Sequence, residues 1–281
     1  MKNRFSSPDW LQKHLDIPDT PFTISESRFE EIRNKMKKFT AEDPEVSVMI
    51  PCWNEEPNIV RTISTFSEQT TQRRTEIVFV NNNSTDRTAE LLDKCGAVSI
   101  FVEKQGISFA RQAGLERAKG KYHLCADADS FYPPDWIETM VKALEDDSVT
   151  CAYGRYSFIP PEGTSRFALG VHEIIAESLF TLRNRRRQYL NVGGANFGFR
   201  TADGKKVGGF NTTRPKWSDG WMAMTLADIG KIQLVKSNSA RVWTSARRLM
   251  ADGSLGKAFV RRVKKEIGRL YEYVFPVEHK K

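Results

Sequence analysis

The sequence predicts an α/β fold in which a largely parallel sheet is covered by helices, and three observations lead to this prediction. From Val46 onward, short apolar runs rich in β-branched residues alternate with amphipathic segments of helical period. The loops that follow the apolar runs are polar and turn-forming. Such a succession is typical of strands joined by crossover helices, which place ligands beyond the carboxyl ends of the strands.

The elements of this unit are predicted in chain order from the period of their apolar residues. Strands alternate with helices, and the fourth strand leads into the polar segment "ADADS". The expected strands are residues 46–50, 76–80, 97–102 and 121–125, and the expected helices are about 56–68, 86–95 and 109–119.

The first 45 residues predict a helical extension that packs on this unit. Ser27 followed by Glu30 resembles a capping box at the start of a helix. The apolar residues that follow share one helical face, namely Phe29, Ile32, Met36 and Phe39.

Composition limits the class of protein. The chain has 281 residues, 40% of them hydrophobic, which is enough for one large domain with a sizeable core. Its four cysteines are far apart and indicate neither a zinc site nor a disulfide framework. No stretch approaches the ~18 apolar residues that span a bilayer, and the amino-terminal segment has no apolar signal region. We expect a cytoplasmic protein, either free or peripheral at the membrane.

The formal charge of +8 is unevenly distributed along the chain. The segment from Arg241 to Lys281 contains eleven Lys and Arg against four Asp and Glu, a local +7. This asymmetry suits nucleic acid, an anionic membrane surface or a phosphorylated substrate, and the charge alone does not choose among them.

Two carboxylates follow the fourth predicted strand. Because residues two apart in an extended segment point the same way, Asp127 and Asp129 can present oxygen ligands toward one point. Mg²⁺ or Mn²⁺ is commonly held by one or two carboxylates together with substrate phosphates. An ordinary solvated turn is the alternative, and the position at a predicted ligand-binding edge favours a metal-bound diphosphate.

The ordered motifs resemble the family 2 glycosyltransferases. They are "VSVMIPCWNEEPNI", "EIVFVNNNSTDRTAELL", "GISFARQAGLERAKGKYHLCADAD", "KVGGFN" and "SDGWMAMTLADIGKI", which together span Val46 to Ile232. The resemblance implies the GT-A fold, a Rossmann-like nucleotide-binding mixed sheet flanked by helices. It also implies a domain over residues 46–245, with a nucleotide-binding half at 46–130 and an acceptor half at 131–245.

The resemblance assigns nucleotide-binding positions in the first half. The segment Asn81 to Asp86 stands where the family has "D-D-G-S-T-D", so the acid that reads the base is replaced by an amide. Asp86 caps the next helix or contacts the ligand, and both interpretations stay open. Glu55 and Arg111 also have alternatives, as a helix N-terminal charge and a solvated cation. The nucleotide-binding set is Pro51, Asn54, Glu55, Asn82, Arg111 and Asp127.

The later motifs are assigned to catalysis and to the acceptor. Ser218 replaces the family's Glu, but Asp219 stays in register and is implied as the general base. A helix N-cap is the alternative role for Asp219. Glycines around Asn196 allow the backbone to turn at the floor of a pocket. The set on the acceptor and phosphate side is Gly194, Asn196, Trp221, Arg247 and Arg248.

Residues 246–281 predict a basic amphipathic helix. Its apolar positions are Leu255, Phe259, Val263, Ile267, Leu270 and Val274, with Lys and Arg between them. This helix either docks on the core or lies on an anionic membrane surface.

The sequence therefore predicts an inverting, metal-dependent glycosyltransferase that uses a nucleotide-sugar donor, with UDP-sugars favoured. The acceptor would be a hydroxyl of a glycan or a lipid-linked compound. A nucleotidyltransferase and a basic nucleic-acid-binding protein are the alternatives. A nucleotidyltransferase would need a Gly-rich phosphate loop after the first strand, where "PCWNEEPN" supplies acids instead. A nucleic-acid-binding protein needs no D-x-D motif, so nucleic acid is disfavoured as a partner.

Overall fold

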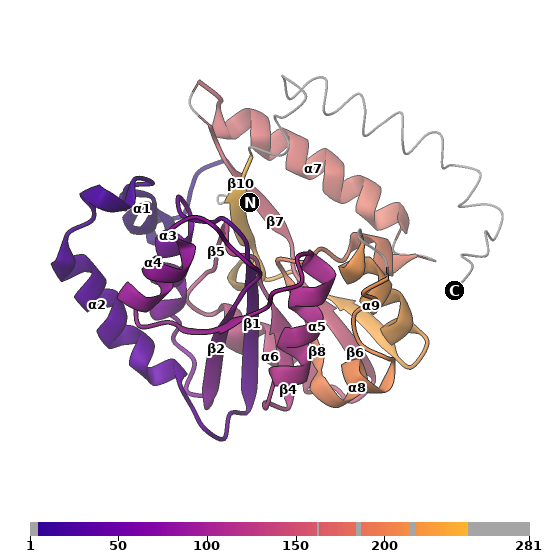
Figure 1. Ribbon diagram of the computed structural model, residues 1–281. Helices are drawn as coiled ribbons and strands as arrows, with labels where there is room; N and C mark the ends of the chain where they lie inside the picture. The colour runs from indigo at the N-terminus through magenta and orange to yellow at the C-terminus, as the bar shows by residue number, and fades with distance from the viewer. Residues whose placement is uncertain (1–4, 162, 184–186, 214–216, 247–281) are drawn as a thin grey trace.

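The computed structural model describes residues 5–161, 163–183, 187–213 and 217–246 (Figure 1). Its centre is a seven-stranded sheet in the order β3-β2-β1-β4-β8-β6-β9. β8 runs antiparallel to both of its neighbours, and the other pairs are parallel, so the sheet is mixed as expected. The strands are β1 (Val46–Cys52), β2 (Thr75–Asn81), β3 (Val98–Phe101), β4 (Tyr122–Cys125), β6 (Val149–Tyr153), β8 (Phe197–Arg200) and β9 (Lys231–Leu234).

Helices cover both faces of this sheet because successive strand residues point to opposite faces. Val48 and Ile50 of β1 belong to one core cluster, whereas Met49 packs with Ala118 on the other face. The first face carries α2 (Glu26–Met36), α3 (Ile59–Ser67), α4 (Thr88–Lys94) and α6 (Trp136–Leu144). The second carries α5 (Ile107–Arg117), α8 (Thr201–Lys206) and α9 (Ser218–Ala227).

The predicted strands and crossover helices are present, with shifted ends. The first crossover helix begins at Ile59 rather than near residue 56, because residues 55–58 form a turn that contains Pro57. The third begins earlier than expected, at Ile107, directly after Gly106 with its φ of +139°. No helix in the described ranges is long and apolar enough to cross a membrane.

The amino-terminal segment packs on the first face of the sheet. It contains α1 (Asp9–Leu15), α2 and the 3₁₀ turns η2 (Pro21–Thr23) and η3 (Lys37–Phe39). The predicted apolar face is buried in the same cluster as β1, namely Phe29, Ile32, Met36 and Phe39. The predicted capping box is wrong in position. Ser25 caps α2 by accepting from the Arg28 N–H, because the helix already begins at Glu26.

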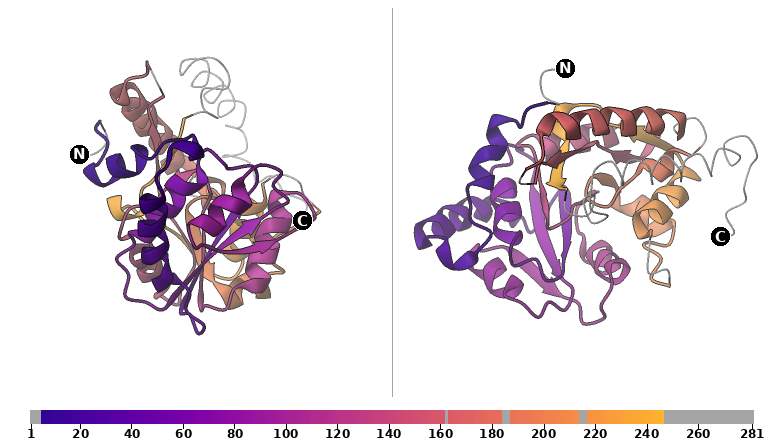
Figure 2. Two further views of the ribbon diagram at one scale, coloured as in Figure 1. Left: turned by 60° about the vertical axis from the view of Figure 1, so that its left-hand side comes forward. Right: turned by 90° about the horizontal axis from the view of Figure 1, so that it is seen from above.

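A smaller sheet lies beside the large one. It has the order β5 (Ser130–Phe131), β10 (Val242–Ser245), β7 (Tyr156–Ile159), so the residues after the D-x-D motif pair with a strand from the end of the described chain. The long helix α7 (Arg166–Arg183) packs on β7. Seen from above, α7 runs across β10 (Figure 2). Two further 3₁₀ turns, η4 (Gln188–Asn191) and η5 (Asn238–Ala240), complete this region.

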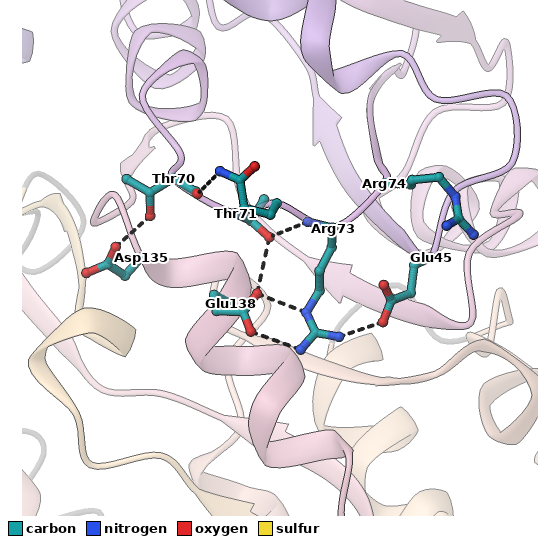
Figure 3. A pocket seen from close by; sticks show the side chains of 8 residues that line it. Glu45, Thr70, Thr71, Arg73, Arg74, Asp135 and Glu138 are labelled. Atoms are coloured by element: carbon teal, nitrogen blue, oxygen red, sulfur yellow. Dashed lines mark hydrogen bonds and ion pairs between the residues drawn. The ribbon is translucent and has the colours of Figure 1, made fainter.

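The amino ends of β1 and β2 border a hollow of about 500 Å³ (Figure 3). Glu45 directly precedes β1, and Arg73 lies just before β2. The Arg73 guanidinium donates to Glu138 of α6 at 2.9 Å and also contacts Glu45 and Glu145. The hydrogen bonds that Arg73 donates to the Glu138 carboxylate raise the pKa of Arg73 above its usual value. These charged side chains pair with one another and connect the starts of β1 and β2 to α6. They lie at the end of the sheet opposite to the predicted ligand edge.

Candidate active site

Two adjoining cavities open at the carboxyl ends of the strands, and both are lined by Asp127 and Asp129. The larger, of about 430 Å³, lies among the loops after β1, β2 and β3 and is called the donor-side cavity below. Its lining includes Pro51, Cys52, Trp53, Glu55, Asn82, Gly106, Ile107, Ala110 and Arg111. The smaller, of about 210 Å³, is called the acceptor-side cavity and is lined by Tyr156, Phe158, Gly193, Gly194, Ala195, Thr244 and Ser245.

The loops after β1 and β2 are tied together by side chains that bond to backbone. Asn54, in the left-handed region with φ of +53°, accepts from the Thr85 N–H at 2.8 Å. Asp86 accepts from the Glu56 N–H at 3.0 Å and from Thr88. Asn54 therefore shapes the wall of the donor-side cavity, while Pro51 and Glu55 line it directly. Asp86 is not the N-cap of α4 (Thr88–Lys94), which is Arg87, but its carboxylate accepts from the N–H of Thr88, the first residue of that helix.

Asn82 bridges the loops after β2 and β3. Its amide donates to the carbonyl oxygens of Val102 and Lys104 at 3.1 and 2.8 Å, and its oxygen accepts from the Gly106 N–H at 2.7 Å. A carboxylate at this position would face those two carbonyl oxygens without a proton to donate. The departure from the family's acid therefore has a local reason, and the amide donors of Asn82 are already bound to backbone.

Arg111 on α5 is the buried cation of the site. Its side chain is 7% exposed, and its Nη2 and Nη1 atoms lie 3.3 Å from the Oδ1 atoms of Asp127 and Asp219 respectively. Nη1 also donates to the Ser218 hydroxyl at 3.0 Å. Burial alone would lower the pKa of Arg111, but Asp219 and Asp127 outweigh it and raise the pKa. The predicted alternative of a solvated helix cation is excluded by this burial.

The site has no room for a side chain at Gly194. A Cβ atom built there would lie 1.6 Å from Arg111 Nη2. The loop 193–195 must therefore pass directly against the guanidinium, and glycine allows this approach. The same loop lines the acceptor-side cavity, so Arg111 lies between the donor side and the acceptor side.

Two tyrosine hydroxyls, of the buried Tyr132 and the partly buried Tyr156, hold the D-x-D motif and the loop 193–195. The Tyr132 hydroxyl accepts from the Asp127 N–H at 2.7 Å and donates to the Ala195 carbonyl at 3.0 Å. The Tyr156 hydroxyl donates to the Gly193 carbonyl at 2.8 Å. Burial raises the pKa of both phenols well above the usual value, so both keep the proton that they donate. Sequence reasoning missed both tyrosines, since an aromatic residue near a motif is ordinarily a core residue.

The turn of the "V-G-G-F" motif is held by α5. Gln112, which replaces the family's usual Asn, accepts from the Phe210 N–H at 2.8 Å. Gly208 and Gly209 have φ of +92° and +72°, which explains the paired glycines of the "V-G-G-F" motif. Farther along, Asp219 lies in the first turn of α9, and the half-buried Trp221 follows on the same helix.

The predicted site residues separate into four groups. Asn54 and Trp221 form one group, because neither is among the residues that line the two cavities. Those that line the cavities or contact Arg111 are Pro51, Glu55, Asn82, Arg111, Asp127, Asp129, Gly194 and Asp219. Asn196 lies apart. Its side chain is fully buried, accepts from the Trp136 indole at 2.9 Å and donates to the carbonyls of Arg155 and Ala240, so it offers no surface to an acceptor. Arg247 and Arg248 lie outside the described residues.

The D-x-D carboxylates fit a divalent cation by the chemistry of their donors. Asp127 and Asp129 both face the two cavities and offer hard oxygen atoms. Among the described residues no group of three or more His, Cys, Asp or Glu could hold a metal. A cation here would thus take two protein carboxylates and complete its shell with diphosphate oxygens and water, which is the usual arrangement for Mg²⁺ beside a nucleotide.

Solved structures share this architecture. S. aureus TarS (residues 1–349) in complex with UDP-GlcNAc is similar with a TM-score of 0.57 and 20% identity, over 72% of this chain and 58% of that one. The mannosyltransferase PcManGT from Pyrobaculum calidifontis, in complex with GDP-Man and Mn²⁺, is similar with a TM-score of 0.55 and 20% identity, over 91% of this chain and 74% of that one. The fold is thus that of the GT-A glycosyltransferases.

The sequence comparison places the chain within that class. It belongs to glycosyl transferase family 2, whose family model matches residues 47–206. Glycosyltransferase GlyA of Streptococcus pneumoniae is 30% identical over 131 residues, which is 44% of this chain and 19% of that protein. The dolichol-phosphate mannosyltransferase of Saccharomyces cerevisiae is 30% identical over 116 residues, 38% of this chain and 43% of that protein. The matches thus span less than half of the length of either relative.

Proposed function

We propose that this protein is an inverting glycosyltransferase that moves a sugar from a nucleoside diphosphate to an acceptor hydroxyl. The observation that carries the proposal is the position of Arg111, which contacts one carboxylate of the D-x-D motif and the carboxylate of Asp219. One buried cation thereby holds the predicted diphosphate site and the predicted base at a fixed separation. Family membership supports the same reaction class.

Asp219 would act as the general base. An acceptor hydroxyl is a poor nucleophile until a positioned carboxylate takes its proton as attack develops. Asp219 is held by Arg111 and remains partly accessible, with 23% of its side chain exposed. The deprotonated oxygen attacks the anomeric carbon, the bond to the diphosphate oxygen breaks on the opposite face, and the configuration at that carbon inverts.

Asp127 and Asp129 would hold Mg²⁺ or Mn²⁺. When bound, the cation stabilises negative charge that develops on the departing nucleoside diphosphate. Arg111 adds a permanent positive charge beside Asp127 at the point where the two cavities meet. The Mn²⁺ in the GDP-Man complex of PcManGT is consistent with this assignment.

The donor-side cavity would take the nucleotide, with Pro51, Glu55 and Asn82 along its wall. We favour a UDP-sugar, and GDP-sugars are the direct competitor, because similar folds are solved with UDP-GlcNAc and with GDP-Man. The acceptor would be a glycan or a lipid-linked compound, with an anionic membrane surface as the place of contact in the second case. The dolichol-phosphate mannosyltransferase among the relatives supports the lipid-linked alternative.

Calorimetric titration with UDP and with GDP, each with and without Mn²⁺, tests the donor site. We expect one nucleotide to bind only in the presence of metal, and Asp127→Ala/Asp129→Ala to abolish that binding because the cation loses both protein ligands. Asp146→Ala/Asp147→Ala, another carboxylate pair near a strand, is the matched control and should bind as the wild type does. Equal binding by wild type and Asp127→Ala/Asp129→Ala would remove the metal from the proposal.

Asp219→Asn tests the base. The amide keeps the size of the side chain but cannot take a proton, so kcat should fall by about 10²- to 10⁴-fold. Nucleotide binding should stay within a factor of about three, because Asp219 does not line the donor-side cavity. Rates are measured as nucleoside diphosphate release, with Asp228→Asn, at the C-cap of the same helix, as the control. A variant that keeps the wild-type rate would show that another group is the base.

A further inference from the structure

The helix α7 has its polar side turned inward. Arg166 makes two hydrogen bonds of 2.8 Å to Glu173, and Glu173 also accepts from the Phe158 N–H of β7. Arg241, which directly precedes β10, donates to Glu177 at 3.0 Å, and Arg155 pairs with the same carboxylate. Buried ion pairs therefore supply much of the contact between α7 and the smaller sheet.

The outward side of α7 is apolar. The exposed side chains between 166 and 178 are Phe167, Ala168, Val171, Ile174, Ile175 and Ser178, and the large ones among them are 36 to 61% exposed. Phe5 extends this surface by stacking on Phe167 with ring centroids 5.0 Å apart. A helix that directs ions inward and isoleucines outward reverses the usual pattern of a surface helix. An apolar patch of this kind marks an interaction surface.

We propose that residues 255–274 of the same chain dock as an amphipathic helix on the outward face of α7. These residues lie outside the described part of the structure, and their sequence places six apolar residues at intervals of three or four. A helix of this length is about 30 Å long, and the 18 residues of α7 span about 27 Å, so the two apolar faces match in extent.

The end of the described chain lies in the right place for this docking. β10 ends at Ser245, which pairs with Ile159, the last residue of β7. The next helix after β7 in the chain is α7. The chain therefore leaves the smaller sheet close to the amino-terminal end of α7. The residues between Ala246 and Leu255 can span up to about 30 Å when extended, so the segment can reach any part of the helix.

Charge favours this occupant over a bilayer. Interfacial helices carry Lys and Arg beside their apolar face, whereas the exposed face of α7 between 166 and 178 carries no charged side chain. The basic residues of 255–274 lie between its apolar positions, so docking on α7 would leave them in water. Because both segments belong to one chain, the effective concentration of the partner is high without any second molecule.

Hydrogen exchange measured by mass spectrometry on the full chain tests the proposal. Peptides from 255–274 should be protected in the wild type and should exchange at least about tenfold faster in Val171→Glu/Ile174→Glu, because two carboxylates would enter the apolar contact. The matched control is Ile229→Glu, since Ile229 is 40% exposed, close to the 38% of Ile174, but lies after α9. The control should leave the protection unchanged.

Disulfide scanning gives a second measurement that does not depend on a charged variant folding. The native cysteines are all buried, so Val171→Cys can be paired with Phe259→Cys, Val263→Cys or Ile267→Cys, and one of these pairs should cross-link under mild oxidation. Ile229→Cys with the same partners should not. Rapid exchange of 255–274 in the wild type would overturn the proposal. Protection of 255–274 that is unchanged in Val171→Glu/Ile174→Glu would also overturn it. The same holds if the wild type is a dimer that this variant dissociates, or if the wild type binds anionic vesicles and the variant does not.

Discussion

Arg111 is the residue on which the geometry of the site depends. A buried guanidinium is costly unless its charge is matched. Here Asp127 and Asp219 supply the opposite charge, and Ser218 accepts a further hydrogen bond. The planar fork of arginine allows these contacts to be made in different directions at once. A lysine would carry the same charge without this reach.

Gly194→Ala should displace Arg111 without touching either carboxylate. The added methyl group would lie 1.6 Å from Nη2, so the guanidinium or the loop 193–195 has to move. A shift of about 1 Å in such a site can cost up to ~10²-fold in rate, and we expect a fall in kcat of that order with the fold retained. Steady-state kinetics and circular dichroism measure the two quantities.

Gly163→Ala is the control for this substitution. A Cβ atom at Gly163 meets no described residue within 4 Å, although the φ of +75° makes the change mildly unfavourable. It should cost about 1 kcal/mol of stability and leave kcat unchanged. If Gly194→Ala behaves like Gly163→Ala, the close packing of the loop on Arg111 has no catalytic importance.

At the scale of elements, the site depends on connections between the two sheets. The D-x-D motif follows β4 of the large sheet, and the next residues form β5 of the smaller one. The loop 193–195 leads into β8 of the large sheet. Tyr132 joins these segments through its hydroxyl, which bonds to Asp127 and Ala195. The metal motif and the acceptor-side loop are therefore held in one register.

Tyr132→Phe should loosen this connection. The Asp127 N–H and the Ala195 carbonyl would lose a buried partner, which should lower the free energy of unfolding by about 1 to 3 kcal/mol. The Mn²⁺ concentration needed for half-maximal activity should rise, because Asp127 loses its backbone anchor.

Tyr156→Phe is the comparison for Tyr132→Phe. Among the described residues its hydroxyl bonds on the acceptor side, to the Gly193 carbonyl. The variant should therefore raise KM for the acceptor and leave the Mn²⁺ dependence unchanged. The same Mn²⁺ dependence in both variants would argue against a specific link from Tyr132 to the metal motif.

At the scale of the whole molecule, two buried histidines couple stability to pH. Burial lowers the pKa of His14 to about 4, where its ring contacts the Ser64 hydroxyl at 2.8 Å. Burial also lowers the pKa of His123 to about 3, in a stack on Phe199. In the unfolded chain both would titrate near 6.5. Between about pH 4 and 6.5 the unfolded state therefore binds more protons, and stability falls as the pH falls.

The free energy of unfolding should accordingly be lower at pH 5 than at pH 7.5, with about 2 kcal/mol of the decrease from each histidine. His123→Phe keeps the ring stack but cannot be protonated, so the difference between the two pH values should shrink by that amount. Urea denaturation at both pH values measures the free energy of unfolding. The test is the difference between the two pH values, compared between wild type and variant, and not the absolute stability of either. An undiminished difference in His123→Phe would assign the acid sensitivity to other groups.

The sequence alone predicted four of the seven strands of the large sheet and the place of the D-x-D pair after the fourth, for a local reason. Apolar period and polar loop ends depend only on neighbouring residues, so the strands that became β1 to β4 and the pair Asp127 and Asp129 could be read directly. Helix starts were less predictable. The shift from Ser27 to Ser25 as the cap of α2 reflects competition between nearby serines that no periodic pattern resolves.

Only the tertiary structure decided how distant residues meet. Arg111 and Asp219 are 108 positions apart, and nothing in either neighbourhood indicates a contact of 3.3 Å. The burial of Asn196 and the bridging hydroxyl of Tyr132 depend likewise on strands that pair across the chain. The reversed polarity of α7 arises because Arg241, from the far end of the described chain, meets Glu177. Periodicity sets which residues are apolar, but the packing of the two sheets sets which partners they find.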